Sequence, residues 1–406
     1  MERPQGHRPG SAAYRRITVA LFLGGLATFA TIYTTQPLLP ELARVFGLSP
    51  ARSALSVSAT TLALGASMLA VGPSSETLGR TRVMHASLLA SSLVTVATAL
   101  APGWHLLLAL RVLLGVAVAG LPGVAVAYLR EEVDPSAASR AAGLYIGGTA
   151  LGGMAGRFVT GGIADLAGWR WAIAAVGLMS LGCAVAVRVL LPPSRRFTPA
   201  PLPLGELLAM TRRMATDPVL LALYGIAFCS MGAFVSAFNA MGFRLAAAPY
   251  GLSVGVAGLV FAVYAPGSVA SARAGRMADR HGARVVVPIA LTTFGSGLAI
   301  TLATPLWLVV AGLSVVSVGF FAAHGVASGW VAERAVRVGR GTAQATSLYL
   351  FAYYLGSSVC GTVAGAAWSA GGWPLVVAWT GGLVLVAVVL ALWLRRVPVL
   401  AVDPTP

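Results

Sequence analysis

The sequence predicts an all-α membrane protein whose twelve transmembrane helices form two six-helix bundles. Hydrophobic residues make up 57% of the chain and charged residues only 10%. Twelve apolar runs are each long enough to span a bilayer, and a weak repeat relates the two halves. A soluble domain carries roughly a quarter of its residues as charges, so lipid must surround most of this chain.

The twelve runs follow from length. A spanning helix needs about 20 mostly apolar residues. The two runs richest in glycine and serine, 141–166 and 342–367, are the least apolar but still long enough. The predicted spans are 17–39, 54–74, 83–101, 104–129, 141–166, 170–191, 217–243, 253–273, 283–303, 306–330, 342–367 and 373–394.

The basic residues give an orientation. All 28 cations are arginine, and the net charge is +16. They stand in short clusters between apolar runs, which excludes the basic face of a nucleic-acid-binding domain. With the N-terminus inside the cell, 22 arginines fall in cytoplasmic segments and four on the opposite side. Positive-inside asymmetry therefore predicts a multi-pass protein of a bacterial inner membrane with both termini cytoplasmic.

A loop rich in proline and arginine divides the runs six and six. We expect an N-terminal bundle over 1–191, a cytoplasmic central loop over 192–216 and a C-terminal bundle over 217–406. A shift of 203 or 204 residues superimposes part of one half on the other. The matched pairs include Gly72 and Gly275, Trp104 and Trp307, Tyr145 and Tyr349, and Trp169 and Trp373. Such a constant shift indicates parallel repeats.

The loop after the second run of each half carries a paired motif. The first copy contains Gly72, Glu76, Gly79, Arg80 and Arg82, and the second contains Gly275, Asp279, Arg280, Gly282 and Arg284. Glycine permits a tight turn, and a carboxylate can pair with arginine or accept hydrogen bonds from a helix N-terminus. We expect the ten residues to form a cytoplasmic latch; the alternative is a loop whose arginines only set topology.

Six plus six spans, a long central loop and these paired motifs resemble the major facilitator superfamily over nearly the whole chain. Its members' loop usually reads G-x-x-x-D-R-x-G-R-[RK], which the second copy matches closely, while the first has Glu76 for Asp and Thr77 for Arg. The resemblance implies two bundles, related by pseudo-twofold symmetry, that rock around a central cavity in alternating access. It also implies a small-molecule substrate and no cofactor.

The fifth run resembles, in part, the glycine-rich antiporter motif of exporters in that superfamily. Gly148, Gly152 and Gly156 are spaced by four, so they share one helix face of nearly bare backbone. The usual Pro after the central Gly is Gly153 here, and the usual final Gly-Gly is Gly156-Arg157. Ordinary close helix packing is the alternative interpretation of this face.

Two arginines, Arg111 and Arg157, fall within spans, where a charge costs roughly 3 kcal/mol or more. Arg111 belongs to a pattern similar to the superfamily's R-x-x-x-G, and its repeat mate is Ser314. No acid lies deep in any run, so either Glu41 or Asp165 reaches one of these arginines or the site is electropositive. An electropositive cavity would favour an anionic or electron-rich solute.

Proton coupling needs a titratable group. His324 is the only histidine in the middle of a run and can titrate near neutrality, and Glu41, at an outer helix end, is the competing carrier. An amide facing lipid would lack hydrogen-bond partners, so Gln36 is expected to line a polar path. Further candidates for the cavity are Tyr33, Asn239 and Tyr349.

These features predict a secondary transporter, monomeric and not an enzyme, that exports drug-like or metabolic compounds in exchange for protons. Import of a small organic anion is the alternative within the same class. A membrane enzyme is disfavoured because no H-E-x-x-H or P-loop occurs. The three cysteines lie in separate runs without metal-ligand spacing, so no metal site is expected. A receptor or scaffold would not account for duplicated gating loops.

Overall fold

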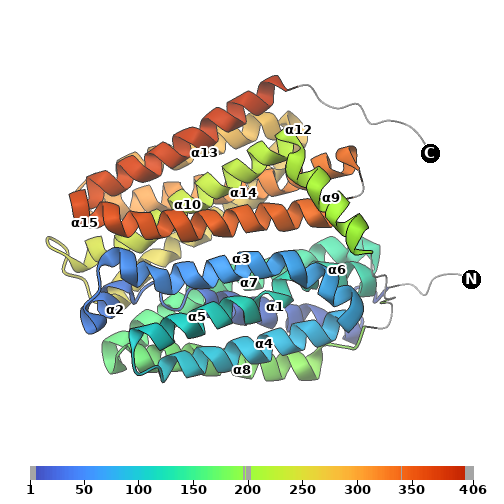
Figure 1. Ribbon diagram of the computed structural model, residues 1–406, viewed down its shortest axis with the longest axis horizontal. Helices are drawn as coiled ribbons and strands as arrows, with labels where there is room; N and C mark the ends of the chain where they lie inside the picture. The colour runs from blue at the N-terminus through green and yellow to red at the C-terminus, as the bar shows by residue number, and fades with distance from the viewer. Residues whose placement is uncertain (1–5, 195–196, 198–202, 340, 398–406) are drawn as a thin grey trace, which may run out of the picture. The chain divides into compact units, whose positions relative to one another are not determined.

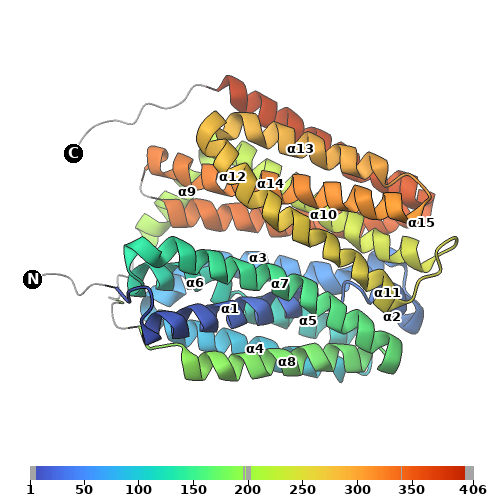
Figure 2. The same cartoon turned by 180° about the vertical axis from the view of Figure 1, so that it is seen from behind.

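The computed structural model describes residues 6–194, 197, 203–339 and 341–397. Apart from one isolated β-bridge between His7 and Val133, the regular structure in these ranges is helical, and long helices are seen in both views (Figures 1 and 2). The expectation of an all-α membrane fold is confirmed. Four arginines of the orientation argument, Arg3, Arg195, Arg196 and Arg340, lie outside the described residues.

The first half of the chain contains eight helices in the described ranges. They are α1 (Ala12–Ile32), α2 (Leu39–Phe46), α3 (Pro50–Leu78), α4 (Arg80–Ala99), α5 (Trp104–Val118), α6 (Gly120–Glu132), α7 (Pro135–Ala167) and α8 (Trp169–Leu190). Helices α5 and α6 together make one span, Trp104–Glu132. The second half contains α9 (Leu204–Thr216), α10 (Pro218–Ala246), α11 (Val254–Gly258), the 3-10 turn η1 (Leu259–Val263), α12 (Tyr264–His281), α13 (Ala283–Ile300), α14 (Leu306–Val338) and α15 (Thr342–Arg396).

Ten of the described helical segments are long and apolar enough to cross a membrane. Helix α15 has 55 residues and breaks its helical dihedrals at Gly371 and Gly372, so it supplies two spans. Helix α7 is absent from the ten because of its glycine-rich composition, but its 33 residues reach about 50 Å at 1.5 Å per residue. Counting both corrections gives the twelve spans that the sequence predicts.

Two differences from the predicted boundaries affect the candidate site. The first run, expected to be helical to residue 39, ends as α1 at Ile32, and the chain resumes a helix at Leu39. Pro37 explains part of this break, since the residue before proline avoids the helical region. Within the central loop, residues 204–216 form α9, whose Met214 carbonyl accepts a hydrogen bond from the Tyr224 hydroxyl at 3.4 Å.

The chain divides into two compact units. Unit 1 contains residues 1–48, 55–201 and 252–261, and unit 2 contains residues 49–54, 202–251 and 262–406. Unit 1 therefore takes in α11 and the start of η1 from the second half of the sequence. Each unit has its own apolar core, with Tyr128 buried in unit 1 and Leu223 in unit 2.

The two units pack their corresponding helices in the same way. In unit 1, Gly152 of α7 lies against the backbone of Leu26 in α1, and a Cβ at this glycine would overlap the Leu26 carbonyl. In unit 2, Gly356 of α15 lies against the Phe228 backbone of α10 with the same lack of room. Because Gly356 is the repeat mate of Gly152, the repeat found in the sequence corresponds to a repeated helix contact.

Candidate functional site

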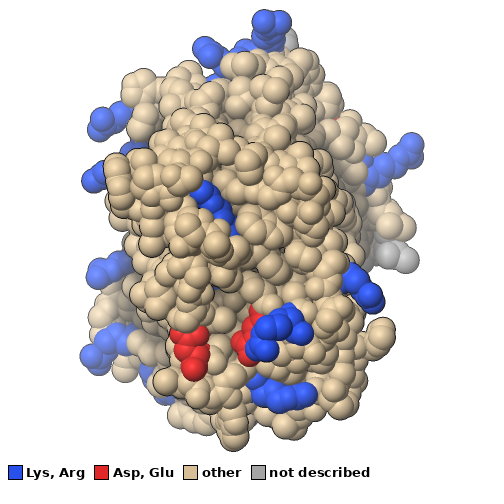
Figure 3. Space-filling view, turned by 90° about the vertical axis from the view of Figure 1, so that its left-hand side faces the viewer, with Lys and Arg blue, Asp and Glu red and all other residues tan. Residues whose placement is uncertain are grey.

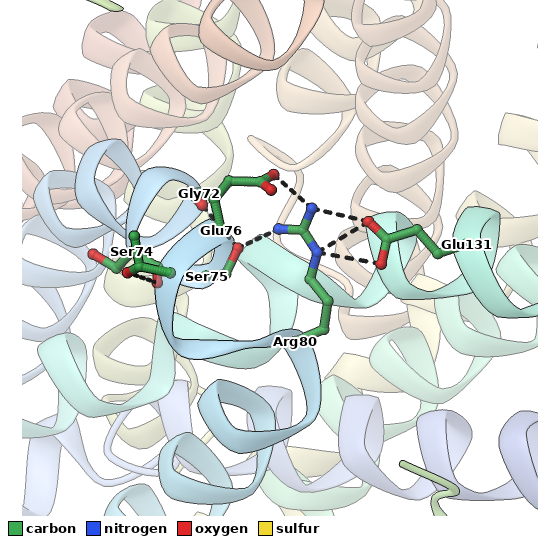
Figure 4. A network of polar contacts seen from close by, with 7 residues as sticks. Gly72, Ser74, Ser75, Glu76, Arg80 and Glu131 are labelled. Atoms are coloured by element: carbon green, nitrogen blue, oxygen red, sulfur yellow. Dashed lines mark hydrogen bonds and ion pairs between the residues drawn. The ribbon is translucent and has the colours of Figure 1, made fainter. Parts of the chain in front are cut away.

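The first loop motif forms a charge network in unit 1 (Figure 4). The Arg80 guanidinium is buried and pairs with Glu76 at 2.5 Å and with Glu131 of α6 at 2.9 Å, while it also donates a hydrogen bond to the Ser75 hydroxyl. Gly79 permits the turn from α3 into α4, with φ of +89°. The network ties the ends of three helices, α3, α4 and α6, to one cation.

The second motif repeats the turn but not the network. Gly282 has φ of +84°, matching Gly79, but the repeat mate of Arg80 is Ala283. Asp279 is exposed and has no ion pair among the described residues. A cavity of ≈ 510 Å³ occupies this end of unit 2, and its lining includes Asp279, Ala283, Arg284, Trp330, Glu333 and Arg337. Ala283 therefore offers only a methyl group at this cavity, whereas the matching position of unit 1 carries the Arg80 guanidinium.

An arginine at position 283 is expected to change the stability of the protein. Ala283→Arg should pair the new guanidinium with Asp279, as Arg80 pairs with Glu76, and raise the free energy of unfolding by about 0.5 kcal/mol, the value of a partly exposed ion pair. Chemical unfolding of the purified protein measures it. Adding Asp279→Asn should cancel the gain, because the new cation then loses its partner. A gain that survives in the double variant would contradict pairing and indicate cavity filling alone.

Within the part of the chain that the structure describes, the other members of the predicted latch form no ion pair. Arg82 and Arg280 are exposed, and Arg284 is half-buried. Gly72 and Gly275 have open space where a Cβ would be, so close packing does not require glycine there. Arg334 and Asp217, which the sequence did not single out, form a partly buried ion pair at 2.7 Å, and Arg334 lines the same cavity. The latch role of all ten residues remains a prediction.

The glycine face of α7 packs on two helices. Gly148, Gly152 and Gly156 lie on the α1 backbone at Phe22, Leu26 and Ala30. One turn further, a Cβ at Gly161 would lie 3.1 Å from the Val254 carbonyl of α11. Asp165, near the end of α7, accepts hydrogen bonds from the Ser253 hydroxyl at 2.5 Å and from the Gly255 amide at 3.0 Å. A single carboxylate thus caps α11 and fixes it to α7.

Arg157 lies at the centre of a polar cluster in unit 1. Its Nε and Nη2 donate hydrogen bonds to the Gln36 side-chain oxygen at 2.8 and 2.5 Å, and its Nη1 donates to the Gly153 carbonyl at 2.6 Å. The guanidinium carbon lies 4.4 Å from the Tyr33 ring centroid and 4.6 Å from the Phe261 ring centroid. The structure therefore brings together three predicted cavity residues, Tyr33, Gln36 and Arg157.

Phe261 is the member of this cluster that the sequence did not indicate. It lies in η1, within a long apolar run, where the sequence gives no reason to single out one aromatic residue as part of a site. It contacts Arg157 because α11 and η1 dock on α7. The one hint in the sequence is that Gly161 and Gly255 are both glycines, which allow two segments of backbone to lie close together.

Arg111 has different surroundings. It is 1% exposed, and its guanidinium donates hydrogen bonds to the Ser56 carbonyl at 2.7 Å, the Thr31 carbonyl at 3.1 Å and the Ile32 carbonyl. Thr31 and Ile32 are the last residues of α1, where carbonyls lack partners within the helix. Arg111 thus caps the C-terminal end of α1 and joins it to α3. These contacts favour a structural role over the predicted role in the cavity.

His324 and Tyr349 meet in unit 2. The His324 Nδ1 atom lies 3.0 Å from the Tyr349 hydroxyl, and the imidazole stacks on Phe320 with ring centroids 5.9 Å apart. The Tyr353 ring lies beside the same imidazole, with ring centroids 4.7 Å apart. Asn239 lies apart from this pair: its side-chain nitrogen is 3.1 Å from where a Cβ of Gly361 would be.

Two acids lie at the end of unit 1 that contains α2. One Glu41 oxygen is buried without a hydrogen-bond partner in the described chain, and the side chain also accepts a hydrogen bond from the Trp169 amide. Burial raises the pKa of Glu41, and nearby Asp165 raises it further, whereas the Trp169 amide and Arg44 lower it. Figure 3 views the molecule from the side where α2 lies and shows acidic atoms beside arginines among mostly uncharged atoms.

A many-spanning α-helical chain, with matching helix contacts in its two halves and a buried polar cluster, has the architecture of a secondary transporter. The sequence profile of the Major Facilitator Superfamily matches residues 21–265 and 230–405, and the chain belongs to this family. The family assignment made from the loop motifs is confirmed.

Relatives and solved structures agree with this assignment. The chain is 41% identical over 387 residues to the inner membrane transport protein YnfM of Escherichia coli (strain K12), covering 95% of this chain and 92% of YnfM. It is 40% identical over 387 residues to the MFS-type transporter YybF of Bacillus subtilis (strain 168), covering 95% and 94%. An occupied, inward-facing bacterial homolog of the human lysosomal transporter Spinster shares the fold, with a TM-score of 0.68, 17% identity and coverage of 95% and 96%. The protein is a multi-pass membrane transporter and not an enzyme.

Proposed function

We propose that this transporter exports small drug-like or metabolic compounds across the inner membrane in exchange for protons, by alternating access. The observation that carries the proposal is the α7 contact with α11. Residues 253–255 attach to α7 through the Asp165 carboxylate and the close approach of Gly161 and Gly255. A contact of two glycines and one carboxylate can be made and broken with little repacking, as a cycling gate requires.

Export is supported by where this contact lies. It continues the face of Gly148, Gly152 and Gly156, the part of the chain that resembles the exporters' glycine-rich motif. Import of a small organic anion remains the second candidate, because the polar cluster of unit 1 is built around the cation of Arg157. Transport in everted vesicles decides between them: an exporter accumulates solute inside such vesicles when they are energised, and an importer does not.

Of the two candidate proton carriers, Glu41 has the better surroundings. It lies in α2, outside the spans, with one oxygen that has no hydrogen-bond partner in the described residues. Its pKa is raised, so it keeps its proton to a higher pH than a free glutamate and can load on the acidic side of the membrane. His324 is enclosed by Phe320, Tyr349 and Tyr353, which favours a packing role.

Glu41→Gln should therefore uncouple transport. We expect proton-driven accumulation to fall at least tenfold while exchange of labelled for unlabelled solute continues, because exchange needs no proton movement. The folded state of the wild type favours protonated Glu41, so its stability should fall as pH rises above the ordinary glutamate pKa, and the variant should lose that dependence. Flux in proteoliposomes and unfolding at several pH values measure both effects.

The controls separate coupling from general damage. Glu206→Gln changes an exposed acid of α9 and should leave flux unchanged. His324→Ala tests the other carrier in the same assay. Full proton-driven accumulation by the Glu41 variant, with loss in the His324 variant, would reject Glu41 and assign coupling to His324.

A further inference from the structure

Two buried hydroxyl groups stand close in the sequence to members of the polar cluster and have no hydrogen-bond partner among the described residues. The Oγ1 atoms of Thr35 and Thr160 are buried and have no hydrogen-bond partner in the described residues. Thr35 adjoins Gln36, and Thr160 stands one helical turn beyond Arg157 on α7. Buried polar groups are nearly always satisfied by protein, water or ligand. Thr160 shares a helix face with Arg157, so its unsatisfied hydroxyl indicates a place beside the guanidinium where a polar ligand or water completes the structure.

Unit 2 supplies an internal comparison. At the shift of 204 residues, the mate of Arg157 is Gly361, and at 203 the mate of Gln36 is Asn239. These mates are neighbours too, since the Asn239 nitrogen lies 3.1 Å from the Cβ position of Gly361. The same helix crossing thus exists in both units, and it needs no guanidinium to form. Arg157 is an addition to a contact that unit 2 makes without charge.

The guanidinium is held in a defined orientation. The Tyr33 and Phe261 rings lie 4.4 and 4.6 Å from its central carbon, so aromatic contacts fix it. Its Nε and Nη2 converge on one oxygen of Gln36. That pair of donors is the fork that binds a carboxylate through two parallel hydrogen bonds, which are stronger than bonds to a neutral amide. Gln36 therefore occupies the position of a carboxylate with a weaker acceptor.

We propose that Arg157 binds the carboxylate of a small organic acid, which displaces the Gln36 amide from Nε and Nη2. The inference rests on the proposed transport function and specifies its substrate class. The solute carboxylate offers two oxygens that share one negative charge, where Gln36 offers one neutral acceptor oxygen. Thr35 and Thr160 provide donors for the remaining polar atoms of the solute or for its water.

Binding to the purified full chain in nanodiscs tests the proposal without any flux measurement. The probes are matched acid and amide pairs: acetate and acetamide, benzoate and benzamide, and phenylacetate and phenylacetamide. For at least one pair we expect the acid to bind at least tenfold more tightly than its amide. If no pair shows this preference, the proposal is overturned.

Three variants separate binding from packing. Arg157→Lys keeps the charge but loses the fork, so the preference should fall at least tenfold. Gln36→Ala removes the competing amide and should tighten acid binding several-fold, whereas a purely structural Arg157–Gln36 pair predicts weaker binding or none. Thr160→Val keeps the side-chain shape, should fold even if Arg157→Lys does not, and should weaken acid binding a few-fold. Unchanged affinities in the folded variants would overturn the assignment.

Failure of the proposed function gives a different result. Carboxylate binding that depends on Arg157, together with no uptake into energised everted vesicles, would reject export and keep the substrate class. Export of neutral compounds at the wild-type rate by Arg157→Lys would reject the substrate class and keep export.

Discussion

Gly152→Leu should prevent the protein from folding to a stable transporter. A Cβ at this position would overlap the Leu26 carbonyl of α1, which is backbone and cannot rotate away. Extra methylenes in a packed core cost about 1–3 kcal/mol even where side chains adjust. In this crossing α1 and α7 must separate along their length, so we expect little monodisperse protein after detergent extraction.

The control lies on the same helix. Gly162 has open space at its Cβ position, so Gly162→Leu should yield protein at nearly the wild-type level. Size-exclusion chromatography of both variants measures the difference. Equal, monodisperse yields would show that α1 and α7 are not in the contact described. The equivalent change in unit 2, Gly356→Leu, should match Gly152→Leu because Gly356 meets the Phe228 backbone in the same way.

The glycine face illustrates what sequence patterns can predict. Glycines spaced by four predict a helix face without side chains, whatever helix packs on it. The constant shift between the halves predicts that the contact at Gly152 is repeated at Gly356. Hydropathy predicts spans because the bilayer sets their length. It fails for α7 for the same reason that α7 packs closely: glycine contributes little hydropathy.

The remaining parts of the site depend on where helices end and on which elements cross. Phe261 reaches Arg157 only because η1 docks on α7, a contact between residues about 100 positions apart in the sequence. The expectation that Glu41 or Asp165 would reach a buried arginine also depended on such contacts. Asp165 instead caps α11, and Glu41 accepts from the Trp169 amide.

The loop motifs show the same limit. Both copies predict a turn at glycine, and Gly79 and Gly282 share it. The sequence pattern weighted the second copy more heavily because it matches the family consensus. Yet the network forms in the first copy, since Arg80 has Glu131 of α6 within reach and Ala283 offers no cation to Asp279. Resemblance to a consensus does not determine which charges meet.

Arg111→Met is the second substitution with a large expected effect. Three carbonyls, of Ser56, Thr31 and Ile32, would lose a charged donor in a buried position. The Ser56 carbonyl keeps the Thr60 hydroxyl and the Thr31 carbonyl keeps the Thr34 amide, so the loss is that of hydrogen bonds to a charged donor. Such bonds contribute about 1.5–3 kcal/mol each, so the free energy of unfolding should fall by roughly 3 kcal/mol or more. The sequence could not predict this role, because the first span was expected to continue to residue 39. In such a helix the Thr31 and Ile32 carbonyls would accept hydrogen bonds from the next turn and would not need Arg111.

Unfolding by SDS titration measures the loss, and two variants define its cause. Arg82→Met removes an exposed arginine and should cost less than about 0.5 kcal/mol. Arg111→Lys keeps the charge, but a single ammonium cannot reach three carbonyls on two helices, so it should recover only part of the stability. If Arg111→Met unfolds like the wild type yet no longer transports solute, capping of α1 is not what Arg111 provides, and the residue belongs to the solute path instead.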